Sequence, residues 1–91
     1  MTDKFIEIKN KYLATFSQKS IDLKSARETK DMPQLHLLLH KLAGSSGGYG
    51  FDDLSTYCQS ALRLMEDKKE EDMTYLDEHI QQIVNLLEMQ Y

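Results

Sequence analysis

The fold is decided by residues 31–50, which read DMPQLHLLLHKLAGSSGGYG. At about 100° per residue, four leucines of this stretch share one arc of a helix, and that arc predicts a face buried in a core. The four are Leu35, Leu38, Leu39 and Leu42. Asp31 can cap a helix that starts at Met32, because Pro33 is tolerated in a first turn. Glycine commonly follows a helix end, so the glycines near position 50 suit its stop.

The rest of the chain also repeats apolar residues every three or four positions, and no strand pattern competes. A first helical stretch is predicted from about Thr2 to Thr29. It is either continuous or bent or broken into two helices near Ser17–Ser20. A further helix is predicted from Phe51 to about Glu66, and a charged turn and helix start over Asp67–Glu71. Helices of this kind with short connections predict an all-α fold, an antiparallel up-down four-helix bundle in one domain over residues 1–91.

Apolar stripes on these helices predict the rest of the core. The first stretch carries Phe5, Ile8, Tyr12 and Phe16, extended by Leu23 and Ala26. The helix after the glycines carries Leu54, Tyr57 or Cys58, Ala61, Leu62 and Met65. The last helix carries Leu76, Ile80, Ile83, Val84 and Leu87.

Composition limits the classes of function that fit. The 91 residues are 41% hydrophobic and 29% charged, which suits one compact domain. Cys58 is the one cysteine and Met1 starts no secretory signal, so a cytoplasmic location is expected. The leucine-rich run over residues 35–42 is too short and too polar to cross a bilayer. A net charge of −4 and scattered lysines argue against binding to nucleic acid.

The face opposite the leucine arc carries the candidate functional residue. His40 lies there on the helical wheel, and Leu37 borders it as an apolar residue on the wrong side for the core. Gly44, Gly47 and Gly48 fall on the same outer side. Glycine inside a helix costs about 0.5–1 kcal/mol relative to alanine, so a bare surface beside His40 indicates close approach by a large partner.

Residues 40–50, HKLAGSSGGYG, resemble the signature of histidine-containing phosphotransfer (HPt) domains. That signature has a histidine, a leucine two residues on, and glycines four and ten residues on. An acidic residue and a leucine before the histidine, and a leucine and a cysteine in the following helix, extend the resemblance. Those flanking residues are Asp31, Leu35, Leu54 and Cys58. The resemblance has good register over roughly residues 20–66.

The resemblance implies a phosphorelay intermediate that carries a phosphoryl group and is not an enzyme. His40 would accept the group from the phospho-aspartate of a receiver domain, or from a sensor histidine kinase, and pass it to another receiver aspartate. The receiver would supply Mg²⁺, so the chain is expected to hold no cofactor or metal of its own and to work as a monomer. The neighbours expected to serve the phosphoryl group or docking are His36, Leu37, Lys41, Gly44, Gly47 and Gly48.

One position departs from the family pattern. HPt domains usually carry a lysine three residues after the histidine, and Ala43 stands there. Lys41 is a possible substitute, although it lies about 100° around the helix in the other direction. Gln59 and Arg63 are both candidates for a polar group that reaches the imidazole from the next helix.

Two other functions compete with phosphotransfer. An HPt-like module can bind a receiver or another partner without transferring a phosphoryl group, and Ala43 in place of lysine favours that alternative. A metal site is the second, because His36 and His40 are four residues apart on one helix face. Two ligands do not make a site, and neither Cys58 nor His79 has diagnostic spacing. Cys58 is expected to be a small buried hydrophobe.

Overall fold

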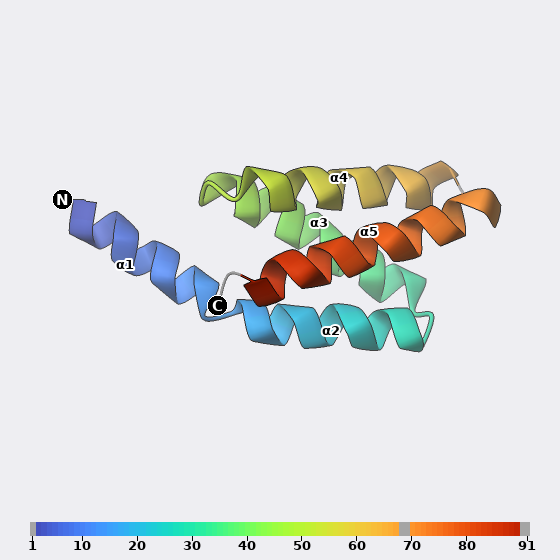
Figure 1. Cartoon of the computed structure of the whole chain (residues 1–91), viewed down its shortest axis with the longest axis horizontal. Coiled ribbons are helices and arrows are strands. Elements are labelled where there is room, and N and C mark those ends of the chain that lie inside the picture. The colour runs from blue at the N-terminus through green and yellow to red at the C-terminus, as the bar shows by residue number, and fades with distance from the viewer. Residues whose placement is uncertain (1, 68–69, 90–91) are drawn as a thin grey trace.

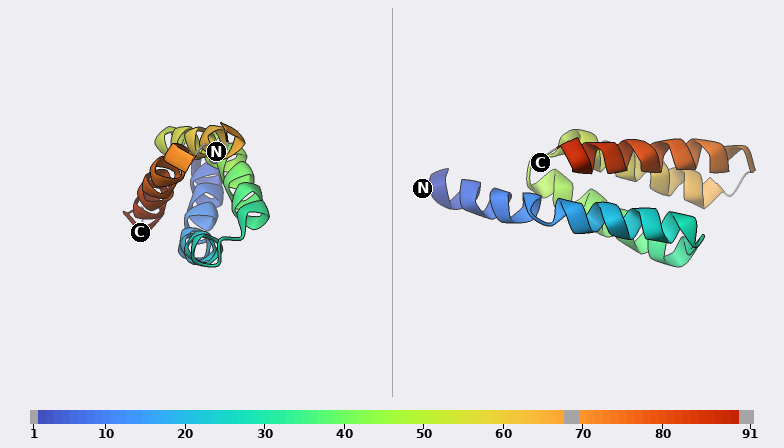
Figure 2. Two further views of the ribbon diagram at one scale, coloured as in Figure 1. Left: turned by 90° about the vertical axis from the view of Figure 1, so that its right-hand side faces the viewer. Right: turned by 60° about the horizontal axis from the view of Figure 1, so that its bottom comes forward.

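The computed structural model describes residues 2–67 and 70–89, which form five helices joined by short connections (Figure 1). These are α1 (Thr2–Leu13), α2 (Phe16–Glu28), α3 (Met32–Gly48), α4 (Asp52–Asp67) and α5 (Glu70–Met89). Helices α2 to α5 run alternately up and down, and the end-on view in Figure 2 shows them around a common core. The predicted all-α four-helix bundle is therefore confirmed.

The core of the bundle is built from the predicted stripes. On α3, Leu35, Leu39 and Leu42 are each at most 2% exposed, whereas Leu38 lies half-buried at the edge of the arc. On α4, Cys58 is buried and Tyr57 is 38% exposed, which resolves the alternative left open by the sequence. The predicted stripe of α5 is buried throughout: Leu76, Ile80, Ile83, Val84 and Leu87.

The first helical stretch is broken, but not where the sequence predicted. The break lies at Ala14 and Thr15, between α1 and α2, whereas Ser20 lies buried within α2. Thr15 is held against the last turn of α1, since its hydroxyl and its backbone N–H both donate to the Tyr12 carbonyl, at 2.6 and 3.0 Å. A hydroxyl that competes for a helical carbonyl in this way favours a helix end over its continuation.

Because of this break, α1 projects past the end of the bundle (Figures 1 and 2). Its predicted apolar stripe is consequently only partly buried. Tyr12 and Phe16 are in the core, whereas Phe5 is 53% exposed and Ile8 is 42% exposed. The expectation that Phe5 and Ile8 join the core is wrong, because none of the described helices α2 to α5 extends far enough to cover them.

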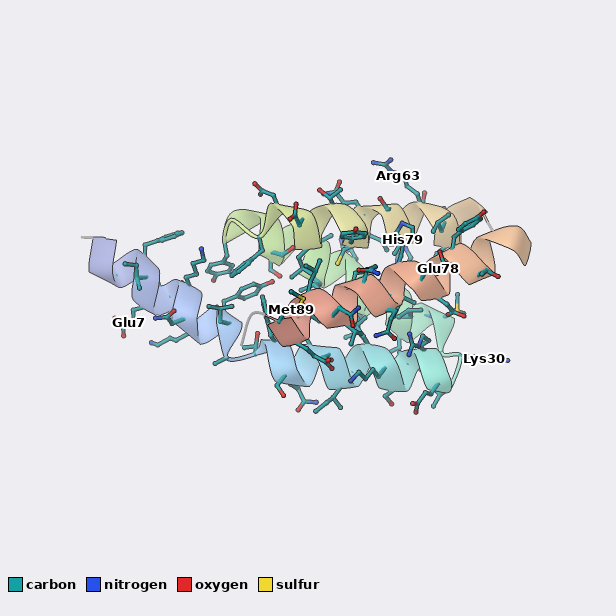
Figure 3. The ribbon with its side chains drawn as sticks, in the orientation of Figure 1. Glu7, Lys30, Arg63, Glu78, His79 and Met89 are labelled. Carbon is teal, nitrogen blue, oxygen red and sulfur yellow. The ribbon has the colours of Figure 1, made fainter. Side chains whose placement is uncertain are left out.

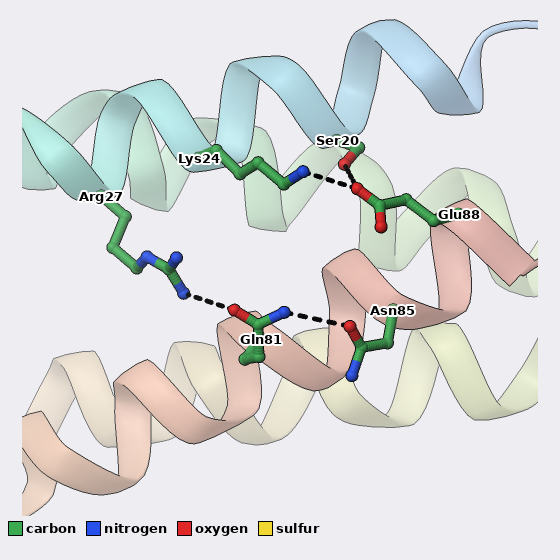
Figure 4. Close-up of polar contacts among 6 residues, drawn as sticks. All are labelled: Ser20, Lys24, Arg27, Gln81, Asn85 and Glu88. Carbon is green, nitrogen blue, oxygen red and sulfur yellow. Dashed lines mark hydrogen bonds and ion pairs between the residues drawn. The ribbon is translucent and has the colours of Figure 1, made fainter.

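Polar contacts join α2 to α5 on the side of the bundle away from α3 (Figure 4). The Lys24 ammonium lies 2.6 Å from a carboxylate oxygen of Glu88, and the Ser20 hydroxyl donates to the same oxygen at 3.1 Å. The Lys24 and Ser20 hydrogen bonds lower the pKa of the Glu88 carboxyl. One turn along, Arg27 donates to Gln81 at 3.3 Å.

Helix α3 begins and ends as the sequence predicts. The Asp31 carboxylate accepts a hydrogen bond from the backbone N–H of Gln34 at 3.2 Å, and a proline occupies the first turn. At the other end, the N–H of Phe51 donates to the Ser46 carbonyl at 2.9 Å. This closure requires positive φ at Gly50, which has φ 86°, and glycine adopts that conformation without strain.

The predicted turn over Asp67–Glu71 lies partly outside the described residues. Asp67 ends α4 and Glu70 begins α5, and residues 68–69 are not described. In the described part of the chain, none of the helices has both the length and the apolar character needed to cross a membrane.

Candidate functional site

The outer face of α3 carries His40 at its middle. Helices α2 and α4 pack against the two flanks of α3, which leaves this face to solvent. His40 is exposed, and Leu37, one turn earlier, is 44% exposed. A Cβ placed on Gly44 or on Gly48 would meet no other atom within 4 Å. The surface of α3 is therefore open at both glycines.

Gly47 has a different environment from the other two glycines. A Cβ at Gly47 would lie 3.4 Å from the Ser55 hydroxyl of α4. Gly47 is exposed like the other two glycines, but it lies on the side of that face next to α4. A methyl group would still fit there in ordinary van der Waals contact.

A chain of hydrogen bonds connects α4 to α3 beside the histidine face. The Ser55 hydroxyl donates to the Ala43 carbonyl at 2.8 Å and accepts from the Gln59 side-chain amide at 3.1 Å. Ser55 is not among the residues predicted from the sequence. The signal available was two polar residues four apart, Ser55 and Gln59, on one edge of a predicted helix.

This chain of hydrogen bonds distinguishes the two polar candidates of α4. Because α3 and α4 are antiparallel, one turn beyond Ser55 on α4 is level with one turn before Ala43 on α3, which is the level of His40. Gln59 occupies that place. Arg63 lies a further turn away and extends outward from the bundle in Figure 3. Of the two candidates, Gln59 is therefore the one that lies level with His40.

Lys41 lies on the opposite flank of α3, towards α2. It lines a hollow of about 300 Å³ between α2 and α3, together with Lys19, Leu38 and Ser45. In that hollow, burial lowers the pKa of the Lys19 amine, and this amine also donates to the Thr15 hydroxyl at 2.8 Å. The two lysines consequently flank a different surface from the one that carries His40.

His36 shares the outer face with His40. Both side chains are exposed, their ring centroids are 6.5 Å apart, and the rings are parallel within 8°. Ala43 is half-buried and offers only a methyl group where the family has lysine. The two imidazoles are thus the titratable groups that the structure places next to each other on this face.

The other sulfur and imidazole groups are held in structural positions. Burial raises the pKa of the Cys58 thiol to about 12, so the thiol is neutral and unreactive in the folded protein. The ring nitrogen Nδ1 of His79 lies 2.8 Å from the Tyr75 carbonyl, and the ring meets Tyr57 edge-on at 6.0 Å. Among the side chains that the structure describes, no group of three or more from His, Cys, Asp or Glu could hold a metal ion.

Comparison with known families agrees with this geometry. The family model of the Hpt domain matches residues 7–89, which cover the whole bundle and all but the start of α1. Comparison with curated proteins and with solved structures finds no significant match. The matched range includes α3 with its exposed histidine and the glycines beside it. The chain therefore belongs to the Hpt domain family, the phosphotransfer modules of two-component signalling.

Proposed function

We propose that His40 is the phosphoacceptor of a phosphorelay. It takes a phosphoryl group from the phospho-aspartate of one receiver domain, or from a sensor kinase, and passes it to the aspartate of another receiver. The observation that carries the proposal is the exposure of His40 beside the open space at Gly44 and Gly48. A receiver has to bring its aspartate in line with the imidazole nitrogen, and a side chain at either glycine would stand in its way.

The chemistry asks little of this chain beyond a well-presented nucleophile. A neutral imidazole nitrogen of His40 attacks the phosphorus, the P–N bond forms as the P–O bond to the aspartate breaks, and the aspartate leaves as a carboxylate. We assign the attack to Nε2, because it projects farthest from the helix. The receiver's Mg²⁺ would neutralise the negative charge on the phosphoryl oxygens during transfer, and this chain orients the imidazole.

The docking surface in this proposal is the outer face of α3. Leu37 supplies apolar contact on one side of His40, and the glycine backbone supplies close approach on the other. A single copy presents the whole surface, so a monomer is sufficient for transfer. Sensor kinases and receivers are the two partner classes of the family. We favour a receiver at the outer face of α3, because a receiver brings its own aspartate and metal.

Transfer of radiolabel from a phosphorylated receiver tests the proposal. Wild-type protein should take up label in an acid-labile, alkali-stable form, and His40→Gln should take up none while keeping the helical content of the wild type. His79→Gln is the matched control, because that imidazole is bonded within its own helix, and it should label normally. Label retained in His40→Gln would place the acceptor elsewhere.

The same experiment separates the alternative of a pure binding module. Ala43 is the observation that favours that alternative, since it removes the usual cation from the site. A receiver that binds the wild-type chain without transferring label would establish the binding module and overturn the carrier.

A further inference from the structure

We infer that His36, in its protonated form, is the cation that compensates the phosphoryl charge on His40 in place of the missing lysine. The inference rests on the proposed function, because it concerns the phosphorylated state of the same site. It assigns the charge partner to His36, because this chain has Ala43 at the position where the family usually has lysine.

The geometry of the two imidazoles carries the inference. His36 and His40 are one turn apart on α3, with parallel rings whose centroids are 6.5 Å apart. On the helical wheel His36 lies about 40° from His40, on the same side as Ala43, which lies about 60° away. His36 therefore flanks His40 from the preceding turn, as a lysine at position 43 would from the following turn.

The space around the pair allows the contact. Both side chains are exposed, so the edge of each ring is accessible from solvent. A phosphoryl group on Nε2 of His40 extends outward from the edge of the imidazole ring. There an N–H of His36 can donate to one of the phosphoryl oxygens. Charge-assisted hydrogen bonds of this kind are shorter and about twice as strong as neutral ones.

The other cations near the site are placed less favourably. Lys41 lines the hollow between α2 and α3, and Arg63 extends outward from α4 (Figure 3). Gln59 is neutral, and its amide already donates to the Ser55 hydroxyl. Histidine gains a proton near neutral pH, and a dianionic neighbour favours the charged form. The cation is thus drawn to His36 when His40 carries the phosphoryl group.

The proton balance of the step is simple. His36 takes one proton from solvent as the phosphoryl group arrives and returns it when the group leaves. No bond forms between His36 and phosphorus. The consequence is a shift of the transfer equilibrium towards phosphorylated His40.

The test compares the equilibrium share of label on the chain when it is mixed with a phosphorylated receiver. His36→Gln should still label on His40, but its share relative to the receiver should fall about fivefold, the effect of losing one partly solvated charge contact. Ala43→Lys added to His36→Gln should restore the share, because it returns a cation to the other side of His40. His79→Gln should match the wild type.

Three outcomes would count against the inference. An unchanged share in His36→Gln would overturn the role of His36 and leave His40 as the acceptor. If the share of label falls in His36→Gln and Ala43→Lys does not restore it, the charge assignment is overturned, because His36 then acts through something other than its charge. A wild-type chain that takes no label would overturn both this inference and the proposed function.

Discussion

The Tyr12 phenol lies 2.6 Å from the Ser45 hydroxyl and joins the break between α1 and α2 to the helix that carries His40. Ser45 also donates to the Lys41 carbonyl at 2.9 Å, so its single proton is used and the Tyr12 phenol is the donor. The Tyr12 ring stacks on Tyr49 at 4.3 Å and meets Phe16 edge-on at 5.3 Å. This aromatic contact fixes the point at which α1 leaves the bundle.

Removing the Tyr12 hydroxyl should weaken the bundle moderately. We expect Tyr12→Phe to lower the free energy of unfolding by about 1 kcal/mol, because the hydrogen bond is lost while the ring contacts remain. Tyr12→Ala should cost about 3–5 kcal/mol, because the ring contacts go as well. Urea denaturation followed by circular dichroism measures both changes. Ser45→Ala combined with Tyr12→Phe should cost less than the sum of the single changes, and additive effects would show that the contact does not stabilise the fold.

Substitutions at Gly44 should affect the stability of the fold and the rate of phosphotransfer independently. Gly44→Ala is expected to raise the free energy of unfolding by about 0.5–1 kcal/mol, because alanine is the better helix former and its Cβ meets open space. Gly44→Leu should remain helical and slow phosphotransfer by about tenfold to a hundredfold, since it displaces the incoming receiver. Thermal unfolding and single-turnover transfer rates measure the two effects.

Glu78→Leu is the control for Gly44→Leu, because it puts the same side chain at an exposed position of α5, whereas the helices that flank α3 are α2 and α4. It should transfer at the wild-type rate. Equal rates for Gly44→Leu and the wild type would sink the argument that bare backbone serves docking.

The buried thiol of Cys58 should give the protein a specific response to alkali. Its pKa is raised from 9.0 to about 12 by burial, so the unfolded chain loses this proton above about pH 9 while the folded chain keeps it. The thiol's contribution to stability is therefore fully present below about pH 9 and is lost as the pH rises towards 12. Comparing the unfolding midpoints of wild type and Cys58→Ala at about pH 8 and pH 10 measures this contribution; parallel shifts would contradict it.

Two residues with positive φ should respond in opposite directions. Lys30 follows α2 with φ 56°, where a side chain is strained, and Gly50 follows α3 with φ 86°. We expect Lys30→Gly to raise the free energy of unfolding by about 0.5–1 kcal/mol and Gly50→Ala to lower it by about 1–2 kcal/mol. Chemical denaturation checks both, and a stabilising Gly50→Ala would show that the closure at Ser46 does not need this conformation.

Local rules predicted much of the bundle from sequence. The arc of leucines in α3, the cap at Asp31 and the closure at Gly50 follow from helix periodicity and end chemistry, which act within a few residues. The exposure of His40 follows from the same periodicity, since the face opposite a buried arc points to solvent. The break before α2 was harder to place, because the serines at 17 and 20 and the threonine at 15 can all end a helix, and the hydrogen bonds from Thr15 to the Tyr12 carbonyl mark where it occurs.

The sequence by itself determined which face of each helix is apolar and which residue of α3 points outward. Only the tertiary structure decided which neighbour lies on each flank, because periodicity gives an angle about a helix axis and says nothing of what packs there. That is why Gly47 turned out to border α4, Lys41 to face α2, and Gln59 to lie nearer the histidine than Arg63. It is also why Phe5 stays exposed: its stripe is regular, but no helix reaches past the end of the bundle to cover it.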